Sequence, residues 1–158
     1  MTAEAEKLEK RARNVLLYQL SRSMKTEHQL REIMTRREIP AEIFEPLLER
    51  FKEAQLIDDT EFARAFVASR TRAGKSVNAI RRELRNKGVE QRVIAVATEL
   101  ISVEDEVSRA SELAQAKLAR MSALEPMVAR RRLQGFLARR GYSSQVISAA
   151  MRQSGVSG

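Results

Sequence analysis

Several residue types are scarce in this 158-residue sequence, and each shortage excludes a class of function. There is no cysteine, which rules out disulfides, thiolate metal sites and cysteine nucleophiles. The single histidine, His28, excludes the histidine clusters of common metal-dependent hydrolases, and we interpret it as a surface residue. No apolar run approaches the roughly 20 residues that span a bilayer, and the charged start is unlike a signal peptide. We therefore expect a cytoplasmic protein with no membrane partner, no catalytic site, no metal and no cofactor.

Aromatic residues, prolines and glycines are also few, at seven, three and six respectively. So few breakers are typical of a helical protein with short connections, and the few aromatics imply an aliphatic core. No stretch alternates apolar and polar residues with a period of two, so we predict no β-strand. The predicted fold class is all-α.

Three segments of the sequence, 30–44, 80–94 and 133–147, align with one another without gaps. Because internal repeats decide the architecture, we predict three tandem three-helix repeats over 1–56, 57–101 and 102–153, followed by a disordered tail at 154–158. The matched apolar positions are Leu30, Ile80 and Leu133; Met34, Leu84 and Leu137; Ile39, Val89 and Tyr142; and Ile43, Val93 and Val146.

Helix-capping signals support this division. Capping-box spacing predicts helix starts at Thr26, Asp58, Ser102 and Ser122, and single caps are expected at Ser76 and Ser143. Gly88 and Gly141 are predicted to end helices in the left-handed conformation. Repeat one has Glu38 at that position, so its turn must differ or tolerate strain. The last helix of repeat two is expected to bury Val93, Ile94, Ala97 and Leu100.

The net charge of +8 is concentrated in two blocks. Residues 70–92 contain 8 basic and 2 acidic residues, and residues 109–158 contain 9 and 2, whereas residues 1–69 contain 12 and 13. This asymmetry favours a polyanionic partner, although one such cluster alone is more often a solvated helix face.

The arginines of each block lie mainly in the helix that precedes the last helix of its repeat. This placement suits phosphate contact better than the base readout of a helix-turn-helix. Four phenylalanines are expected in the core, which leaves few aromatics for base stacking: Phe44, Phe62, Phe66 and Phe136. On charge alone, the candidate filament- and DNA-binding residues are Arg70, Arg72, Lys75, Arg81, Arg82, Arg85, Lys87, Arg130, Arg131, Arg132, Arg139 and Arg140.

The run LIDDTEFARAFVASRTRAGKSVNAIRRELRNKGV, residues 56–89, resembles the signature of RecX, the bacterial regulator of the RecA recombinase. The similarity extends over 12–153 and includes the three-repeat layout. The sequence departs from the family pattern at Lys75, where an aromatic residue is common, and at Glu38. The matching positions are Ile57, Asp58, Asp59, Phe62, Ala63, Phe66, Arg70, Arg72, Gly74, Ile80, Glu83, Leu84, Lys87 and Gly88.

The resemblance implies an elongated, curved array of repeats that binds the RecA–single-stranded-DNA filament along its groove. Such proteins limit filament extension, ATP hydrolysis, strand exchange and co-protease activity in DNA repair and the SOS response. The expected protein is a monomer that binds free single-stranded DNA more weakly, with double-stranded DNA as a further candidate. The alternative from charge alone is an architectural DNA-binding protein without sequence specificity.

Overall fold

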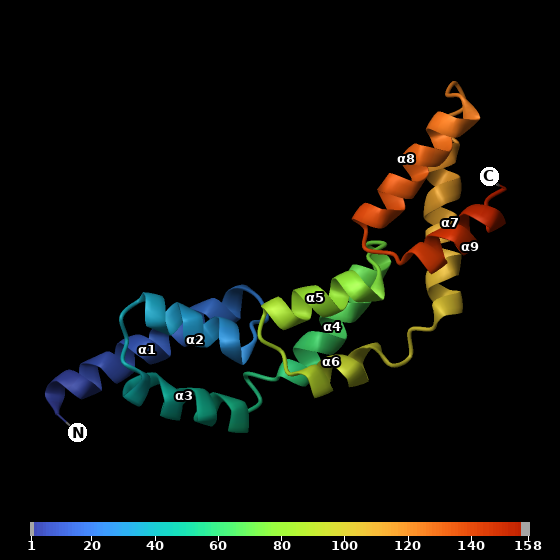
Figure 1. Ribbon diagram of the computed structural model, residues 1–158. Helices are drawn as coiled ribbons and strands as arrows, with labels where there is room; N and C mark the ends of the chain where they lie inside the picture. Colours follow the sequence, from blue (N-terminus) through green and yellow to red (C-terminus); the bar gives the residue numbers. More distant parts are fainter. Residues whose placement is uncertain (1, 156–158) are drawn as a thin grey trace. The chain divides into compact units, whose positions relative to one another are not determined.

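The computed structural model describes residues 2–155, which contain nine α-helices and no β-strand (Figure 1). The predicted all-α fold is confirmed, while the repeat boundaries and the curvature of the array stay predictions. No helix in the described part of the chain is both long and apolar enough to cross a membrane. The helices are α1 (Ala3–Arg22), α2 (Glu27–Arg36), α3 (Ala41–Glu53), α4 (Asp59–Arg72), α5 (Val77–Asn86), α6 (Gln91–Thr98), α7 (Val103–Leu118), α8 (Pro126–Arg139) and α9 (Ser144–Gln153).

Five of the predicted helix caps are in place. In each, a side-chain oxygen accepts a hydrogen bond from the backbone N–H three residues later, which satisfies one of the free donors of the helix start. The capping residues are Thr26, Asp58, Ser76, Ser102 and Ser143. Local sequence therefore predicts where α2, α4, α5, α7 and α9 begin.

Two local predictions are wrong. Helix α8 begins at Pro126 with Glu125 at the N-cap position, so Ser122 lies in the preceding turn and caps nothing. The proline ring presets the first helical residue. Helix α6 ends at Thr98, and Leu100 is 89% exposed because it lies beyond the helix whose apolar stripe it was expected to join.

Left-handed turns follow the second helix of all three repeats. Gly88 has φ +81° and Gly141 has φ +94°, as predicted. Glu38 occupies the matching position with φ 60°, so repeat one keeps the same turn and tolerates the strain of a left-handed non-glycine residue. The predicted tail at 154–158 begins in a turn at Ser154 and Gly155, and residues 156–158 lie outside the described residues.

The gapless alignment of the repeats predicts the cores correctly. The first two sets of aligned positions are all 0% exposed: Leu30, Ile80 and Leu133, then Met34, Leu84 and Leu137. The third set is also buried. In the last set Val146 is buried, whereas Ile43 and Val93 are half-buried. One pattern of burial therefore recurs in all three repeats.

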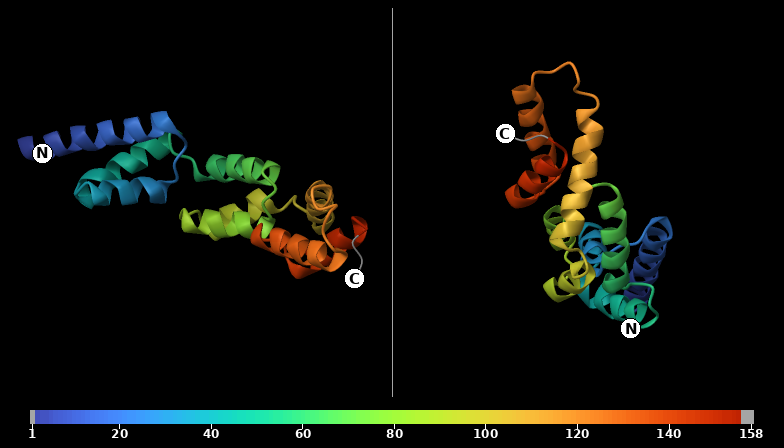
Figure 2. Two further views of the ribbon diagram at one scale, coloured as in Figure 1. Left: turned by 90° about the horizontal axis from the view of Figure 1, so that it is seen from above. Right: turned by 90° about the vertical axis from the view of Figure 1, so that its right-hand side faces the viewer.

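The chain divides into two compact units that do not coincide with the repeats. Unit one comprises Met1–Ala65 and Leu84–Ile94, and unit two comprises Phe66–Glu83 and Ala95–Gly158. Helices α1, α2 and α3 pack together in unit one, and α7 packs against α8 and α9 in unit two (Figure 2). Each outer repeat thus forms a compact body with part of repeat two.

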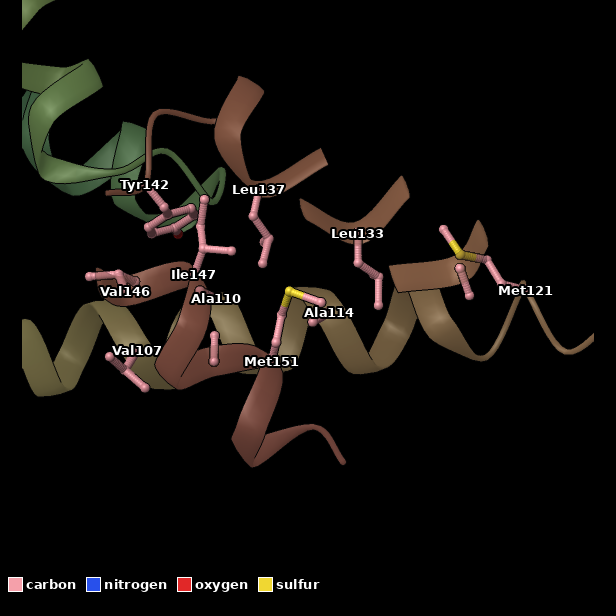
Figure 3. Close-up of a cluster of buried hydrophobic side chains, with 12 residues drawn as sticks. Val107, Ala110, Ala114, Met121, Leu133, Leu137, Tyr142, Val146, Ile147 and Met151 are labelled. Atoms are coloured by element: carbon pink, nitrogen blue, oxygen red, sulfur yellow. The ribbon is translucent and has the colours of Figure 1, made fainter. Parts of the chain in front are cut away.

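The core of unit two lies where the three helices of the third repeat pack together. Side chains of α8 and α9, including Leu133, Leu137 and Met151, gather over Ala110 and Ala114 of α7 (Figure 3). Both alanines are 0% exposed, and their small side chains let the neighbouring helices approach closely.

Candidate functional site

Helix α5 presents a cationic face opposite its buried stripe. Residues three and four apart lie next to each other on a helix, so Arg81, Arg82 and Arg85 occupy one side. Ile80 and Leu84 occupy the other side, and both are fully buried. Burial of these two residues leaves Arg82 and Arg85 exposed and Arg81 half-buried on the opposite side.

The cations of repeat two differ in their contacts. Arg70 is half-buried: its guanidinium carbon lies 4.4 Å from the centroid of the Phe66 ring, and its Nε lies 3.4 Å from Glu83 Oε2. Arg81 Nε donates to Thr98 Oγ1 at 3.2 Å, which ties α5 to α6. Both arginines are thus engaged within the fold, Arg70 with an acidic side chain and Arg81 with a neutral hydroxyl.

A second group of repeat-two cations is exposed to solvent. Arg72, Arg82 and Arg85 are exposed and form no ion pair within residues 2–155. Lys75 and Lys87 are half-buried. The three exposed arginines are consequently the best placed of this block to contact a polyanion.

Helix α8 has a similar face in repeat three. Arg131, Arg132 and Arg139 are exposed on one side of the helix, and Arg130 is half-buried. Gly135 lies between them, and a Cβ at this position would come within 3.1 Å of Arg139 Nη1. Glycine in a helix interior costs about 1 kcal/mol relative to alanine, and at this position it leaves room for the Arg139 guanidinium group.

Arg140 follows this face but points into the fold. Its Nη1 donates to the carbonyl oxygen of Ala73 at 2.7 Å, and its guanidinium carbon lies 4.9 Å from the centroid of the Phe136 ring. Phe136 is only partly buried, and Lys117 Nζ also lies 4.9 Å from that centroid. The prediction that Phe136 lies in the core is therefore only partly correct.

The first junction between repeats joins the N-terminus of α2 to repeat two. Thr26 Oγ1 donates to the carbonyl oxygen of Lys87 at 2.6 Å, directly before the left-handed Gly88. The backbone N–H of Glu27 donates to Asp59 Oδ1 at 3.0 Å. Burial raises the pKa of Asp59, against the lowering effect of this hydrogen bond. All these residues belong to unit one.

The second junction repeats this arrangement at the N-terminus of α5, wholly within unit two. The backbone N–H of Ser76 donates to the carbonyl oxygen of Arg140 at 3.1 Å, directly before Gly141. The N–H of Val77 donates to Glu106 Oε2 at 2.9 Å. The helix start that leads to the cationic face of α5 is thus held by the third repeat.

Tyr142 completes the second junction. Its hydroxyl donates to the carbonyl oxygen of Gly74 at 3.1 Å in a buried position. Burial raises the pKa of Tyr142, and the negative charge of Glu106 raises it further. The tyrosine therefore stays protonated, which the donated hydrogen bond requires.

The structure places the candidate cations in both units: Arg85 and Lys87 in unit one, the others in unit two. The described residues contain no group of three or more His, Cys, Asp or Glu that could hold a metal ion. The arrangement can bind anions through exposed guanidinium groups, and its role in binding stays a prediction.

A cationic groove that was not among the predicted sites lies in unit one, where α1 and the end of α2 meet. Residues 1–69 have nearly balanced charge, which conceals that lysines and arginines share one side of α1. A helical-wheel projection of 3–22 is the signal that could have revealed it.

Fold and site together define a tandem helical-repeat protein that displays cationic helix faces. Each repeat matches a family model of its own: the first, second and third three-helix domains of RecX, over residues 12–51, 58–97 and 104–151. The chain belongs to the RecX family.

Individual relatives agree with this assignment. The chain is 38% identical to the regulatory protein RecX of Thermobifida fusca, over 96% of this chain and 83% of that protein. It is 41% identical to the regulatory protein RecX of Streptomyces coelicolor, over 90% of this chain and 76% of the relative.

Solved structures also resemble it. A crystal structure of regulatory protein RecX matches with a TM-score of 0.78 and 25% identity, over 98% of this chain and 74% of the other. RecX from Lactobacillus salivarius matches with a TM-score of 0.82 at 18% identity, over 96% and 99% of the two chains, and this likeness concerns the fold alone.

Proposed function

We propose that this protein regulates the RecA recombinase in the cytoplasm, mainly negatively, by binding the filament that RecA forms on single-stranded DNA. Membership of the RecX family supports the recombinase as the target. The protein acts as a monomer and has no catalytic activity of its own. When bound, it limits filament extension, ATP hydrolysis, strand exchange and co-protease activity.

The observation that carries the mechanism is the pair of exposed cationic faces on α5 and α8. Guanidinium groups without internal ion pairs bind phosphate and carboxylate without first breaking a contact, and arginine matches both geometries. Arg82 and Arg85 on α5 and Arg131, Arg132 and Arg139 on α8 meet this condition within residues 2–155. These five residues are the proposed primary contacts.

The test measures inhibition of recombinase ATP hydrolysis on single-stranded DNA. The double variant Arg82→Glu/Arg85→Glu keeps Arg81, which bonds to Thr98, so the fold is left intact. We expect unchanged helix content by circular dichroism and at least a tenfold rise in the inhibitor concentration needed, since contacts with charged groups contribute about 1.5 kcal/mol or more.

The matched control is Arg92→Glu/Arg120→Glu, which makes the same change in net charge at exposed positions outside the two faces. It should inhibit as the wild type does. If both double variants lose inhibition equally, net charge alone governs binding, and the alternative of an architectural DNA-binding protein is favoured.

A further inference from the structure

A groove on unit one has a lining that suits a nucleic-acid strand. Its volume is about 450 Å³, and α1 forms most of it together with the residue that ends α2. None of the described residues that line it is acidic. The polar and aromatic lining residues are Lys7, Lys10, Arg11, Asn14, Tyr18 and Arg37.

Helical periodicity explains how α1 collects these residues on one side. Lys7, Arg11 and Tyr18 are spaced by four and seven residues, so they follow one stripe along the helix. The core stripe carries Ala12 and Leu16, both 0% exposed. The stripe from Lys7 to Tyr18 extends about 17 Å along the axis at 1.5 Å per residue, which is long enough for more than one nucleotide.

The acidic residue nearest the middle of α1 is occupied elsewhere. Glu9 Oε1 accepts from Arg13 at 2.8 Å and lies 3.4 Å from Arg50 Nη2. In contrast, the groove cations Lys7, Lys10, Arg11 and Arg37 are exposed and form no ion pair within residues 2–155. In the described part of the chain, the groove lining therefore carries four cations and no acidic residue.

Tyr18 adds an aromatic surface to this charge. Its side chain is 53% exposed, although a tyrosine ring has much apolar area to bury. Arg22 Nη1 donates to the Tyr18 hydroxyl at 2.8 Å, and the Arg22 guanidinium carbon lies 5.6 Å from the ring centroid. The arginine thus lies beside the ring, and its planar guanidinium group adds to the surface on which a base can stack.

We propose that this groove is a binding site for single-stranded nucleic acid, in which the four cations contact phosphates and Tyr18 stacks on a base. Cations beside a tyrosine also occur at protein interfaces, but four cations and one exposed ring along a single groove fit a strand that carries a phosphate and a base at each step. This proposal rests on the proposed function, because the groove would be a second contact between the protein and the single-stranded DNA of the RecA filament.

The test is fluorescence anisotropy with labelled oligothymidylate and an abasic oligonucleotide of equal length, in the absence of recombinase. Tyr18→Ala should weaken oligothymidylate binding roughly 5- to 160-fold, the range for loss of one base-stacking side chain, and leave abasic binding unchanged. Tyr18→Trp should restore binding. The control Leu17→Ala removes a neighbouring side chain that is 48% exposed and lies outside the groove lining, and should have no effect.

A salt titration tests the cations. Arg11→Ala should make the slope of log affinity against log salt shallower by about 0.7, as expected for one lost phosphate contact with a single strand. The control Arg36→Ala removes an equally charged, exposed residue of unit one outside this groove and should leave the slope unchanged.

Equal losses on both oligonucleotides for Tyr18→Ala, or no loss, would overturn the proposal. An acidic peptide that competes as strongly as oligothymidylate would overturn it in favour of a protein partner. Because no recombinase is present, these outcomes are separate from any failure of the proposed function.

Discussion

Substitution of Gly88 by alanine tests the architecture of the first junction. Gly88 has φ +81°, and an added Cβ would lie well inside van der Waals contact with the Cβ and ring of His28. The left-handed conformation costs about 1–2 kcal/mol for a residue with a Cβ, and overpacking against a helix adds about 1–3 kcal/mol. The expected loss in free energy of unfolding is therefore about 2–5 kcal/mol.

Gly155 supplies the matched control because it has φ +80° and nothing within 4 Å of an added Cβ. Gly155→Ala should show the backbone strain alone, at most about 1–2 kcal/mol. Urea unfolding followed by far-UV circular dichroism measures both variants. Equal losses for the two alanines would show that close packing at the junction contributes nothing, and the account of the junction would be wrong.

Two further predictions concern the polar groups of the junctions. The pKa of Asp59 is raised in the folded protein, so ionisation of its carboxyl group opposes folding. The stability contributed by the protonated carboxyl group is fully present below the unfolded-state pKa. It is lost as the pH rises through the folded-state pKa. Asp59→Asn keeps an acceptor for the Glu27 N–H and should be at least as stable as wild type at pH 7. Asp59→Ala loses that acceptor and should lose about 1 kcal/mol of unfolding free energy in thermal or urea unfolding. An asparagine variant that is less stable than the alanine variant would contradict this. Tyr142→Phe should lose about 0.5–1.5 kcal/mol in the same assay because the carbonyl of Gly74 loses its buried donor, and an unchanged midpoint would show that the hydrogen bond adds no stability.

The sequence predicts the local structure well because caps, left-handed turns and apolar periodicity act over a few residues. Thr26 and Ser102 form the predicted capping boxes, and Gly88 adopts the predicted turn. Errors arise where a helix ends without a strong signal, as at Thr98, which leaves Leu100 outside the helix. A periodic pattern carries no information on where the helix that would display it stops.

Candidate binding residues are harder to predict because charge counts do not show contacts. Arg70, Arg81 and Arg140 belong to the basic blocks, but each is engaged within the fold by a partner more than ten residues away in sequence: Glu83, Thr98 and Ala73 respectively. The reverse error affects Lys7 and Arg11, whose segment is nearly neutral in total. Their charge becomes apparent only when the helix separates them from Glu9.

Salt titration of both complexes tests whether the protein recognises a nucleoprotein filament rather than DNA alone. Among the twelve candidate cations, engagement of about four to six phosphates on bare single-stranded DNA would give a slope of roughly −3 to −4 in log affinity against log salt. Contacts between proteins include apolar and directional parts that salt screens little.

Co-sedimentation with RecA filaments and with bare single-stranded DNA, from low to physiological salt, gives the two slopes directly. We expect a shallower slope and a higher remaining affinity at physiological salt for the filament. Coincident curves would contradict it, because they would mean that the protein binds only phosphate and that the recombinase adds no contact.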